Sequence, residues 1–342
     1  MLATRPTPPR RIDAPRAFAL ALTLTLAGGL AAPVARAQAA AAASGPATTA
    51  VPAATPAPYG PALPAAVINS ARIAEASGLA ASRRHPGVLW LHNDGDNPAA
   101  LVAIDAASGA VRGELSIAGV RNVDWEDLAA FERDGRHYLA IADVGDNGGI
   151  RRDLAIHVVE EPAALAATMS APVAWTTRFT WPDGARDCEA MAVDAAAGTF
   201  LLASKKRVPP ELFAVPIAPA ADGAAHVAEA LGHFTGVAQP SAEDLARNPV
   251  YGRYRSQLTA LDQHPDGLQL LALNYRTALL WTRAPGEPWA EAIARPAVEL
   301  PFAWLPQAEA AGFAADGDAV WITTERRPTP LLRLARRGGQ AP

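Results

Sequence analysis

The sequence predicts an all-β protein, and three observations lead to this prediction. Five related motifs recur along the chain: 75-EASGLAAS-82, 124-DWEDLAAF-131, 187-DCEAMAVD-194, 257-QLTALDQH-264 and 307-QAEAAGFA-314. A glycine follows each motif at a nearly constant distance, in three cases as an Asp-Gly pair, which is typical of tight hairpins. Short apolar runs follow each glycine, and helical periodicity is nearly absent. Repeats spaced 49 to 70 residues apart therefore predict the blades of a five-bladed β-propeller.

Each repeat supplies three or four strands. The motif is the first strand, and the second strands read VLWLHND, HYLAIADV, TFLLASKK, LQLLALNY and AVWITTER. The last repeat ends after its third strand, so we expect 66-AVINSARIA-74 to supply the missing outer strand and close the ring. A sixth blade between residues 189 and 259 is the alternative, although that interval contains no sixth motif.

The N-terminus has the composition of an export signal. Arg10, Arg11 and Arg16 precede the apolar run 17–32, and the triplet Ala35-Arg36-Ala37 is a cleavage signature. We therefore expect a signal peptide at 1–37, an Ala/Pro-rich linker at 38–64 and the propeller domain at 65–338. No second long apolar run follows, so we expect a secreted or periplasmic monomer without a transmembrane anchor.

Composition excludes several function classes. The formal net charge is −4, and no basic block with interleaved aromatic residues occurs, which argues against a nucleic acid polymer as partner. The single cysteine, Cys188, can form no internal disulfide, and we expect it to serve in packing. The sequence contains no G-x-S-x-G motif and no phosphate-cradling glycine loop, which argues against an α/β serine hydrolase and against nucleotide cofactors.

One column of the aligned motifs holds only oxygen-bearing side chains, which we call the anchor residues: Ser77, Glu126, Glu189, Thr259 and Glu309. The first strand of a propeller blade lines the central channel, so these side chains should converge near one mouth. Three carboxylates and two hydroxyls suit Ca²⁺ rather than zinc. The alternative is that the acids only cap strand starts or bond backbone amides. We expect Trp125 to pack between blades and Asp127 to point away from the axis.

The loops between second and third strands should lie at the same mouth. The loops 92-HNDGDN-97 and 143-DVGDNGG-149 are acidic, and Asp94 and Asp146 are candidate catalytic residues that could orient water or hold a second cation. The other loops carry cations that we expect to be exposed and to bind an anionic substrate, namely Lys205, Arg207, Arg276 and Arg326. The insertion 236–256 is a candidate lid. Ordinary turn composition and solvated surface charge are the alternative explanation.

Two resemblances follow from these residues. The anchor order Ser, Glu, Glu, Thr, Glu resembles the calcium-activated nucleotidases (apyrases), which implies these five residues as Ca²⁺ ligands. The stretches VLWLHNDGDN, DWEDLAAF, IADVGDN and DCEAMAVD resemble secreted bacterial propellers of the "esterase-like activity of phytase" type. The first resemblance implies a calcium-dependent hydrolase of phosphoesters or phosphoanhydrides. A non-catalytic propeller that binds a ligand or partner around a structural calcium, and a lactonase-type hydrolase, are the alternatives.

Overall fold

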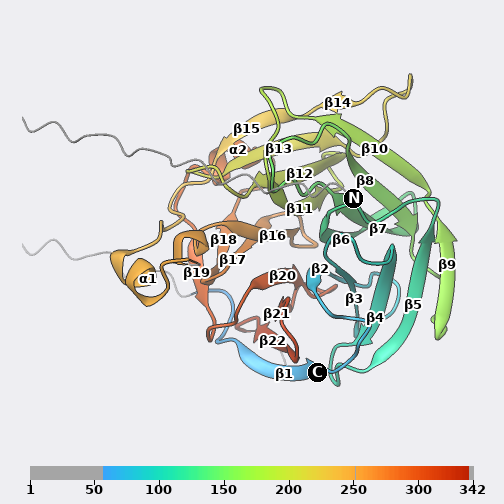
Figure 1. The fold of residues 1–342 in the computed structure, drawn as a ribbon, viewed down its shortest axis with the longest axis horizontal. Helices are drawn as coiled ribbons and strands as arrows, with labels where there is room; N and C mark the ends of the chain where they lie inside the picture. The colour runs from blue at the N-terminus through green and yellow to red at the C-terminus, as the bar shows by residue number, and fades with distance from the viewer. Residues whose placement is uncertain (1–56, 251, 339–342) are drawn as a thin grey trace, which may run out of the picture. The chain divides into compact units, whose positions relative to one another are not determined.

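The computed structural model describes residues 57–250 and 252–338. The predicted signal peptide and residues 38–56 of the predicted linker lie outside the described residues. The described chain forms five β-sheets, which follow one another as the blades of a ring (Figure 1). The predicted five-bladed propeller is confirmed, and the interval between residues 189 and 259 contains no sixth blade among its described residues.

The strands of each blade run from the channel outward. Blade 1 contains β2 (Ala76–Ala81), β3 (Val88–Asn93), β4 (Ala100–Asp105) and β5 (Val111–Ala118), with β9 (Thr168–Pro172) added outside. Blade 2 contains β6 (Trp125–Arg133), β7 (Arg136–Asp143), β8 (Leu154–Glu160) and β10 (Trp175–Thr180), with β14 (His226–Val227) added outside. Blade 3 contains β11 (Cys188–Asp194), β12 (Thr199–Ser204), β13 (Glu211–Pro216) and β15 (Glu229–His233).

The last two blades have four strands each. Blade 4 contains β16 (Leu258–Gln263), β17 (Gln269–Asn274), β18 (Thr277–Thr282) and β19 (Val298–Pro301). Blade 5 contains β20 (Ala308–Phe313), β21 (Ala319–Thr324), β22 (Thr329–Ala335) and β1 (Leu63–Ile68). In the described part of the chain, three short helices interrupt the connections: α1 (Ala242–Arg247), η1 (Gly252–Tyr254) and α2 (Trp289–Ala292).

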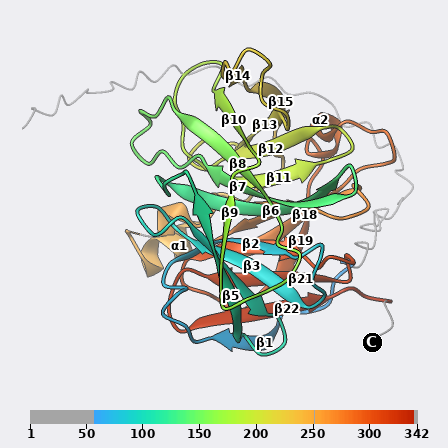
Figure 2. The same ribbon diagram turned by 90° about the vertical axis from the view of Figure 1, so that its right-hand side faces the viewer.

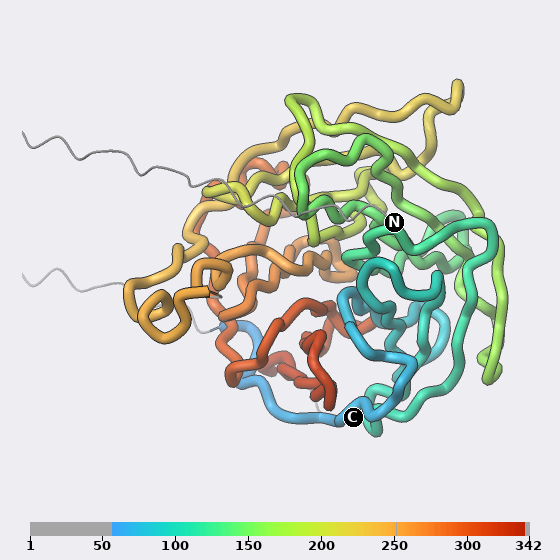
Figure 3. The backbone as a smooth tube through the Cα atoms, in the orientation of Figure 1, coloured from blue at the N-terminus to red at the C-terminus, as the bar shows by residue number. Residues whose placement is uncertain are grey.

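The N-terminal strand closes the ring, as predicted. The strand β1 pairs antiparallel with β22, with Leu63 opposite Arg333 and Ile68 opposite Thr329. Figure 3 shows this N-terminal segment beside the C-terminal strands. The strand begins three residues before the expected stretch, and contacts continue upstream, since Tyr59 is buried and donates a hydrogen bond to the carbonyl of Gly317 at 3.0 Å. Both ends of the described chain are therefore tied into blade 5.

Apolar side chains fill the spaces between blades. Trp90 of β3 and Trp125 of β6 are fully buried in one cluster between blades 1 and 2, which confirms the predicted packing of Trp125. Cys188 is buried in the cluster between blades 2 and 3 and forms no disulfide, as expected for a packing residue. The inner strands are buried on both faces, between the two neighbouring blades. Apolar side chains on both faces stabilise the fold when they leave water, so these strands are apolar along most of their length.

Every inner strand carries a β-bulge at its anchor residue. The pairing register shifts at Ser77, Glu126, Glu189, Thr259 and Glu309, each of which is the second residue of its strand. A bulge leaves one residue without a partner in the ladder and redirects its side chain. The same bulge thus recurs in all five blades, and it leaves each of the five anchor residues without a partner in the regular strand pairing.

The face on which the inner strands begin is called the mouth face here. Its loops and blade connections are residues 69–75, 94–99, 119–124, 144–153, 181–187, 205–210, 234–257, 275–276, 302–307 and 325–328. The helix α1 lies on this face and α2 on the opposite one (Figure 2). Within the described ranges, no helix combines the length and apolarity needed to cross a membrane.

Candidate functional site

Asp127 crosses the central channel, so the prediction that it points away from the axis was wrong. Its carboxylate accepts hydrogen bonds from the backbone N–H groups of Met191 in blade 3 at 2.8 Å and Leu261 in blade 4 at 2.9 Å, and from that of Leu128 at 2.8 Å. Inner strands have no partner strand on the channel side, and their buried N–H groups need acceptors. Burial raises the pKa of Asp127 well above its usual range, although these three donors oppose the rise.

The two hydroxyl anchors link neighbouring blades. Ser77 donates to the backbone carbonyl of Glu126 at 2.7 Å, and Thr259 donates to that of Ala308 at 2.9 Å. Glu309 accepts a hydrogen bond from the Tyr275 hydroxyl at 2.8 Å. Ser77 and Thr259 therefore use their hydrogens to join blades 1 and 2 and blades 4 and 5, while Glu309 is held by blade 4.

The remaining two anchors meet three further acids. The described residues include two groups of three carboxylates whose oxygens lie within 4.8 Å of one another. The first group is Asp94, Asp124 and Glu126, and the second is Glu126, Asp187 and Glu189. Asp124 and Asp187 were not predicted as site residues. The signal for them was present, since both motifs read Asp-x-Glu, with the aspartate two residues before the anchor.

Two glycines allow the first group to assemble. A Cβ atom on Gly145 would overlap the carboxylates of Glu126 and Asp124, and one on Gly95 would lie 2.6 Å from Asp124 Oδ1. Both glycines belong to the Gly-Asp-Asn sequences of the acidic loops. The backbone of each loop therefore lies in close contact with the carboxylates. A side chain in place of Gly95 or Gly145 would displace the carboxylate of Asp124.

The two groups differ in how their charge is balanced. In the second group, Lys205 forms an ion pair with Glu189, and Lys206 lies 2.8 Å from Asp187 Oδ2. In the first group, the carboxylates of Asp124 and Glu126 accept no hydrogen bond and form no ion pair with any described residue. Burial, followed by the charge of Asp94, raises the pKa of Glu126 well above its usual range and that of Asp124 to about 6. The first group therefore lacks the cation that the second one has.

Lys205 is a buried residue rather than the exposed loop cation we expected. Only 9 % of its surface is accessible, because it directly follows β12 and its backbone N–H donates to the carbonyl of Asp187. Its ammonium group lies 5.8 Å from the ring centroid of Tyr275 and pairs with Glu189. Besides this ion pair, its charge lowers the pKa of Glu126 and Glu309 against the rise that burial causes, so Lys205 acts on all three anchor glutamates.

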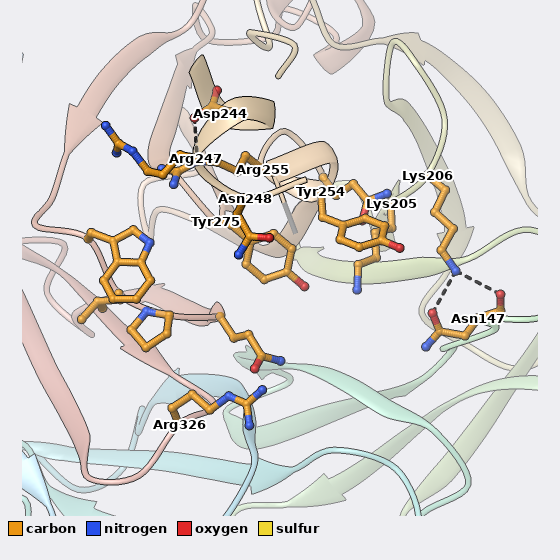
Figure 4. Close-up of a pocket in the computed structure, with 16 residues that line it drawn as sticks. Asn147, Lys205, Lys206, Asp244, Arg247, Asn248, Tyr254, Arg255, Tyr275 and Arg326 are labelled. Atoms are coloured by element: carbon orange, nitrogen blue, oxygen red, sulfur yellow. Dashed lines mark hydrogen bonds and ion pairs between the residues drawn. The ribbon is translucent and has the colours of Figure 1, made fainter. Parts of the chain in front are cut away.

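A cavity of about 530 Å³ opens beside these groups on the mouth face (Figure 4). Lys205, Lys206 and Tyr275 line it, and Arg326 and Trp304 line it from blade 5 and the connection before it. The insertion 236–256 forms another wall, to which Arg247, Tyr254 and Arg255 contribute. Tyr251 lies outside the described residues. The lining thus combines several cations with three aromatic rings.

The other predicted substrate and catalytic residues have structural partners. Asp146 is buried and accepts the backbone N–H groups of Ile150 and Arg151, both at 2.8 Å, so it shapes the loop between β7 and β8. Arg207 lies 3.8 Å from Glu211, and Arg276 lies 3.3 Å from Asp244, and neither lines the cavity. Of the four predicted cations, Lys205 and Arg326 reach the cavity.

Comparison with known proteins adds little to this picture. No family model and no curated protein matches the sequence. Solved structures that share features with the fold include a mitotic checkpoint complex (13 % identity, TM-score 0.35, 75 % of this chain and 62 % of that chain) and a nidogen/laminin complex (13 %, 0.39, 73 % and 73 %). A third is the hydrazine synthase of Kuenenia stuttgartiensis (11 %, 0.43, 80 % and 98 %). No TM-score among these three reaches one half, so the propeller assignment rests on the strand topology given above.

Proposed function

We propose that this protein is an exported, calcium-dependent hydrolase that acts on phosphoester or phosphoanhydride bonds of a small anionic substrate at the mouth face. One observation carries the proposal. Glu126 is only 4 % exposed, has no hydrogen-bond or ion-pair partner for its carboxylate among the described residues, and lies among the oxygens of Asp94 and Asp124. A buried carboxylate group of this kind is stabilised by a cation.

The donor set favours calcium. Asp94, Asp124 and Glu126 offer only oxygen atoms, from two loops and one strand, and flexible oxygen ligands of this kind suit Ca²⁺. When bound, calcium polarises a phosphoryl oxygen. The five anchor residues implied by the apyrase resemblance contribute Glu126 to this set. The proposed ion therefore lies on the side of blades 1 and 2, while Lys205 supplies the positive charge next to Glu189.

The cavity supplies the substrate contacts. Lys206 and Arg326 place positive charge on its wall, and the Arg326 guanidinium forms no ion pair with a described residue. Cations in a partly enclosed site bind phosphate oxygens and neutralise charge that develops as the bond breaks. Tyr254 and Trp304 offer apolar surface for the rest of the substrate. We propose export on the N-terminal composition alone, since residues 1–37 lie outside the described residues.

Calcium titration tests the metal part of the proposal. Calcium should bind the purified protein and raise its melting temperature, since a ligand at a hundred times its Kd adds about 2.7 kcal/mol to the free energy of unfolding. Glu126→Gln should abolish both effects. Glu132→Gln, an exposed position on the same strand β6, is the matched control and should behave as wild type. Equal calcium responses in the two variants would exclude the first carboxylate group.

Hydrolysis assays separate the remaining alternatives. We expect calcium-dependent release of phosphate from p-nitrophenyl phosphate, nucleotides or phytate, and loss of that activity with chelator and in Arg326→Ala. Calcium binding without turnover of any of these substrates would favour a non-catalytic binding propeller. Calcium-dependent opening of simple lactones without phosphate release would favour a lactonase-type enzyme.

A further inference from the structure

The exposed large apolar side chains gather on the mouth face. Of nine such side chains in the described residues, six belong to its loops and connections: Val123, Ile150, Val208, Leu245, Val250 and Trp304. The remaining three lie on the outer strands β1 and β14. Ile150, Val208 and Trp304 are 79 %, 69 % and 67 % exposed. Among the described residues, the mouth face therefore carries six exposed large apolar side chains, and the loops of the opposite face carry none.

Charge is also separated between the two faces. Among the described residues, the mouth face carries ten exposed Lys and Arg against five exposed Asp and Glu. The loops of the opposite face carry two exposed cationic residues against six acidic ones. The chain as a whole has a net charge of −4, so the positive mouth face runs against its overall balance. A face of this kind attracts a negatively charged surface over several ångströms.

The apolar and cationic residues are neighbours. Ile150 precedes Arg151 and the exposed Arg152, and Val208 follows the exposed Lys206 and Arg207. Apolar tips flanked by cations bind the interface of an anionic bilayer, because the tips enter the headgroup region while the cations meet lipid phosphates. The six tips come from five separate segments of the mouth face, so a partner must contact tips that are carried by different loops. A fluid lipid surface accepts each tip separately.

We propose that the mouth face docks on the surface of an anionic phospholipid bilayer. Ile150, Val208 and Trp304 insert at the interface, and Arg152 and Arg327 are among the cations that contact lipid headgroups. This docking requires neither calcium nor hydrolysis, so it stands or falls independently of the proposed function.

Vesicle co-sedimentation of the full chain tests the proposal. The protein should partition onto vesicles of phosphatidylcholine mixed with phosphatidylglycerol more strongly than onto phosphatidylcholine alone, and salt should weaken the binding. The double variant Ile150→Asp/Val208→Asp should bind at least about tenfold more weakly. Val227→Asp, an equally exposed valine on β14 at the outer edge of blade 2, is the control and should bind as wild type.

A second pair of variants tests the cations. Arg152→Glu/Arg327→Glu should weaken binding by about fivefold or more for each changed residue. Arg337→Glu, on the opposite face, should not. Lipids with a doxyl quencher should reduce fluorescence in the wild type but much less in Trp304→Phe. All variants share one N-terminus, so differences between them report the mouth face alone.

Three results would overturn the proposal. One is equal binding of the mouth-face variants and their controls. Another is unchanged vesicle binding in Ile150→Ser/Val208→Ser, which removes the apolar tips without adding charge, since the effect would then be charge adsorption alone. The third is a dimer in sedimentation velocity that the same double variant separates, since the apolar tips would then serve a second copy of the chain.

Discussion

Replacing Asp127 with alanine should markedly lower the free energy of unfolding of this propeller. The carboxylate accepts three backbone N–H groups from three blades, at Leu128, Met191 and Leu261. Each buried N–H group left without an acceptor costs about 1–3 kcal/mol. Removing the buried carboxylate also removes its desolvation penalty, which offsets part of this cost. We therefore expect the free energy of unfolding to decrease by about 3–5 kcal/mol.

Asn in place of Asp127 should have a smaller effect. The amide oxygen can still accept from Met191 and Leu261, which share one carboxylate oxygen, while the amide NH₂ would face the N–H of Leu128. One hydrogen bond is lost and two donors face each other, so the free energy of unfolding should decrease by about 1–3 kcal/mol. Urea unfolding at constant pH with chelator present measures both variants against wild type.

Asp262→Ala is the matched control for this experiment. Asp262 is also buried near the axis, but its carboxylate accepts only two backbone N–H groups, those of Gln263 at 2.8 Å and Phe313 at 2.7 Å. Its loss should cost less than that of Asp127. The free energy of unfolding of Asp127→Ala could instead lie within about 1 kcal/mol of the wild-type value. Water would then replace the carboxylate in the channel, and the interpretation of Asp127 as the link between three blades would fail.

Three further predictions follow from the site. Lys205→Met should lower the free energy of unfolding by about 3 kcal/mol, since it leaves Glu189 buried without its cation, and thermal melting should detect this; a melting temperature within a degree of wild type would contradict it. Gly145→Ala should fold but lose calcium binding in calorimetry, because the new Cβ would overlap the carboxylates of Glu126 and Asp124. Gly148→Ala in the same loop should fold and bind calcium, since its Cβ would lie 3.5 Å from the nearest atom, Cγ1 of Ile150. Identical calcium titrations of the two variants would show that a side chain at position 145 does not displace the carboxylates. Burial, followed by the charge of Glu325, raises the pKa of Glu309 from 4.5 to about 7, so without calcium the free energy of unfolding should fall by on the order of 3 kcal/mol as the pH rises from about 4.5 to about 7. The stability falls because Glu309 loses its proton in the unfolded state at a lower pH than in the folded state. A free energy of unfolding that does not change with pH in wild type, or that has the same pH dependence in Glu309→Gln, would show that this carboxyl does not titrate as described.

Local sequence was sufficient to predict the blades. Glycine turns fix hairpins, apolar runs form buried strands, and both features depend on residues close in the chain. The anchor column was visible because one residue type recurred at one position of five motifs. The closing strand was also predictable, since blade 5 lacked an outer strand and the N-terminal stretch was apolar. Its start at Leu63 was not, because the alanine, proline and glycine residues around Tyr59 gave no sign that this tyrosine would be buried.

Only the tertiary structure decided what the anchor residues contact. The sequence placed Glu126 and Glu309 in one column, yet the bulges and loops bring Asp94 and Asp124 to the first and Tyr275 to the second. Asp127 was misjudged for the same reason, because strand alternation does not hold at a bulge. Lys205 looked like an exposed loop cation until the fold set it beside Glu189. Distances between residues of different blades depend on how the sheets pack, and no pattern within one repeat encodes them.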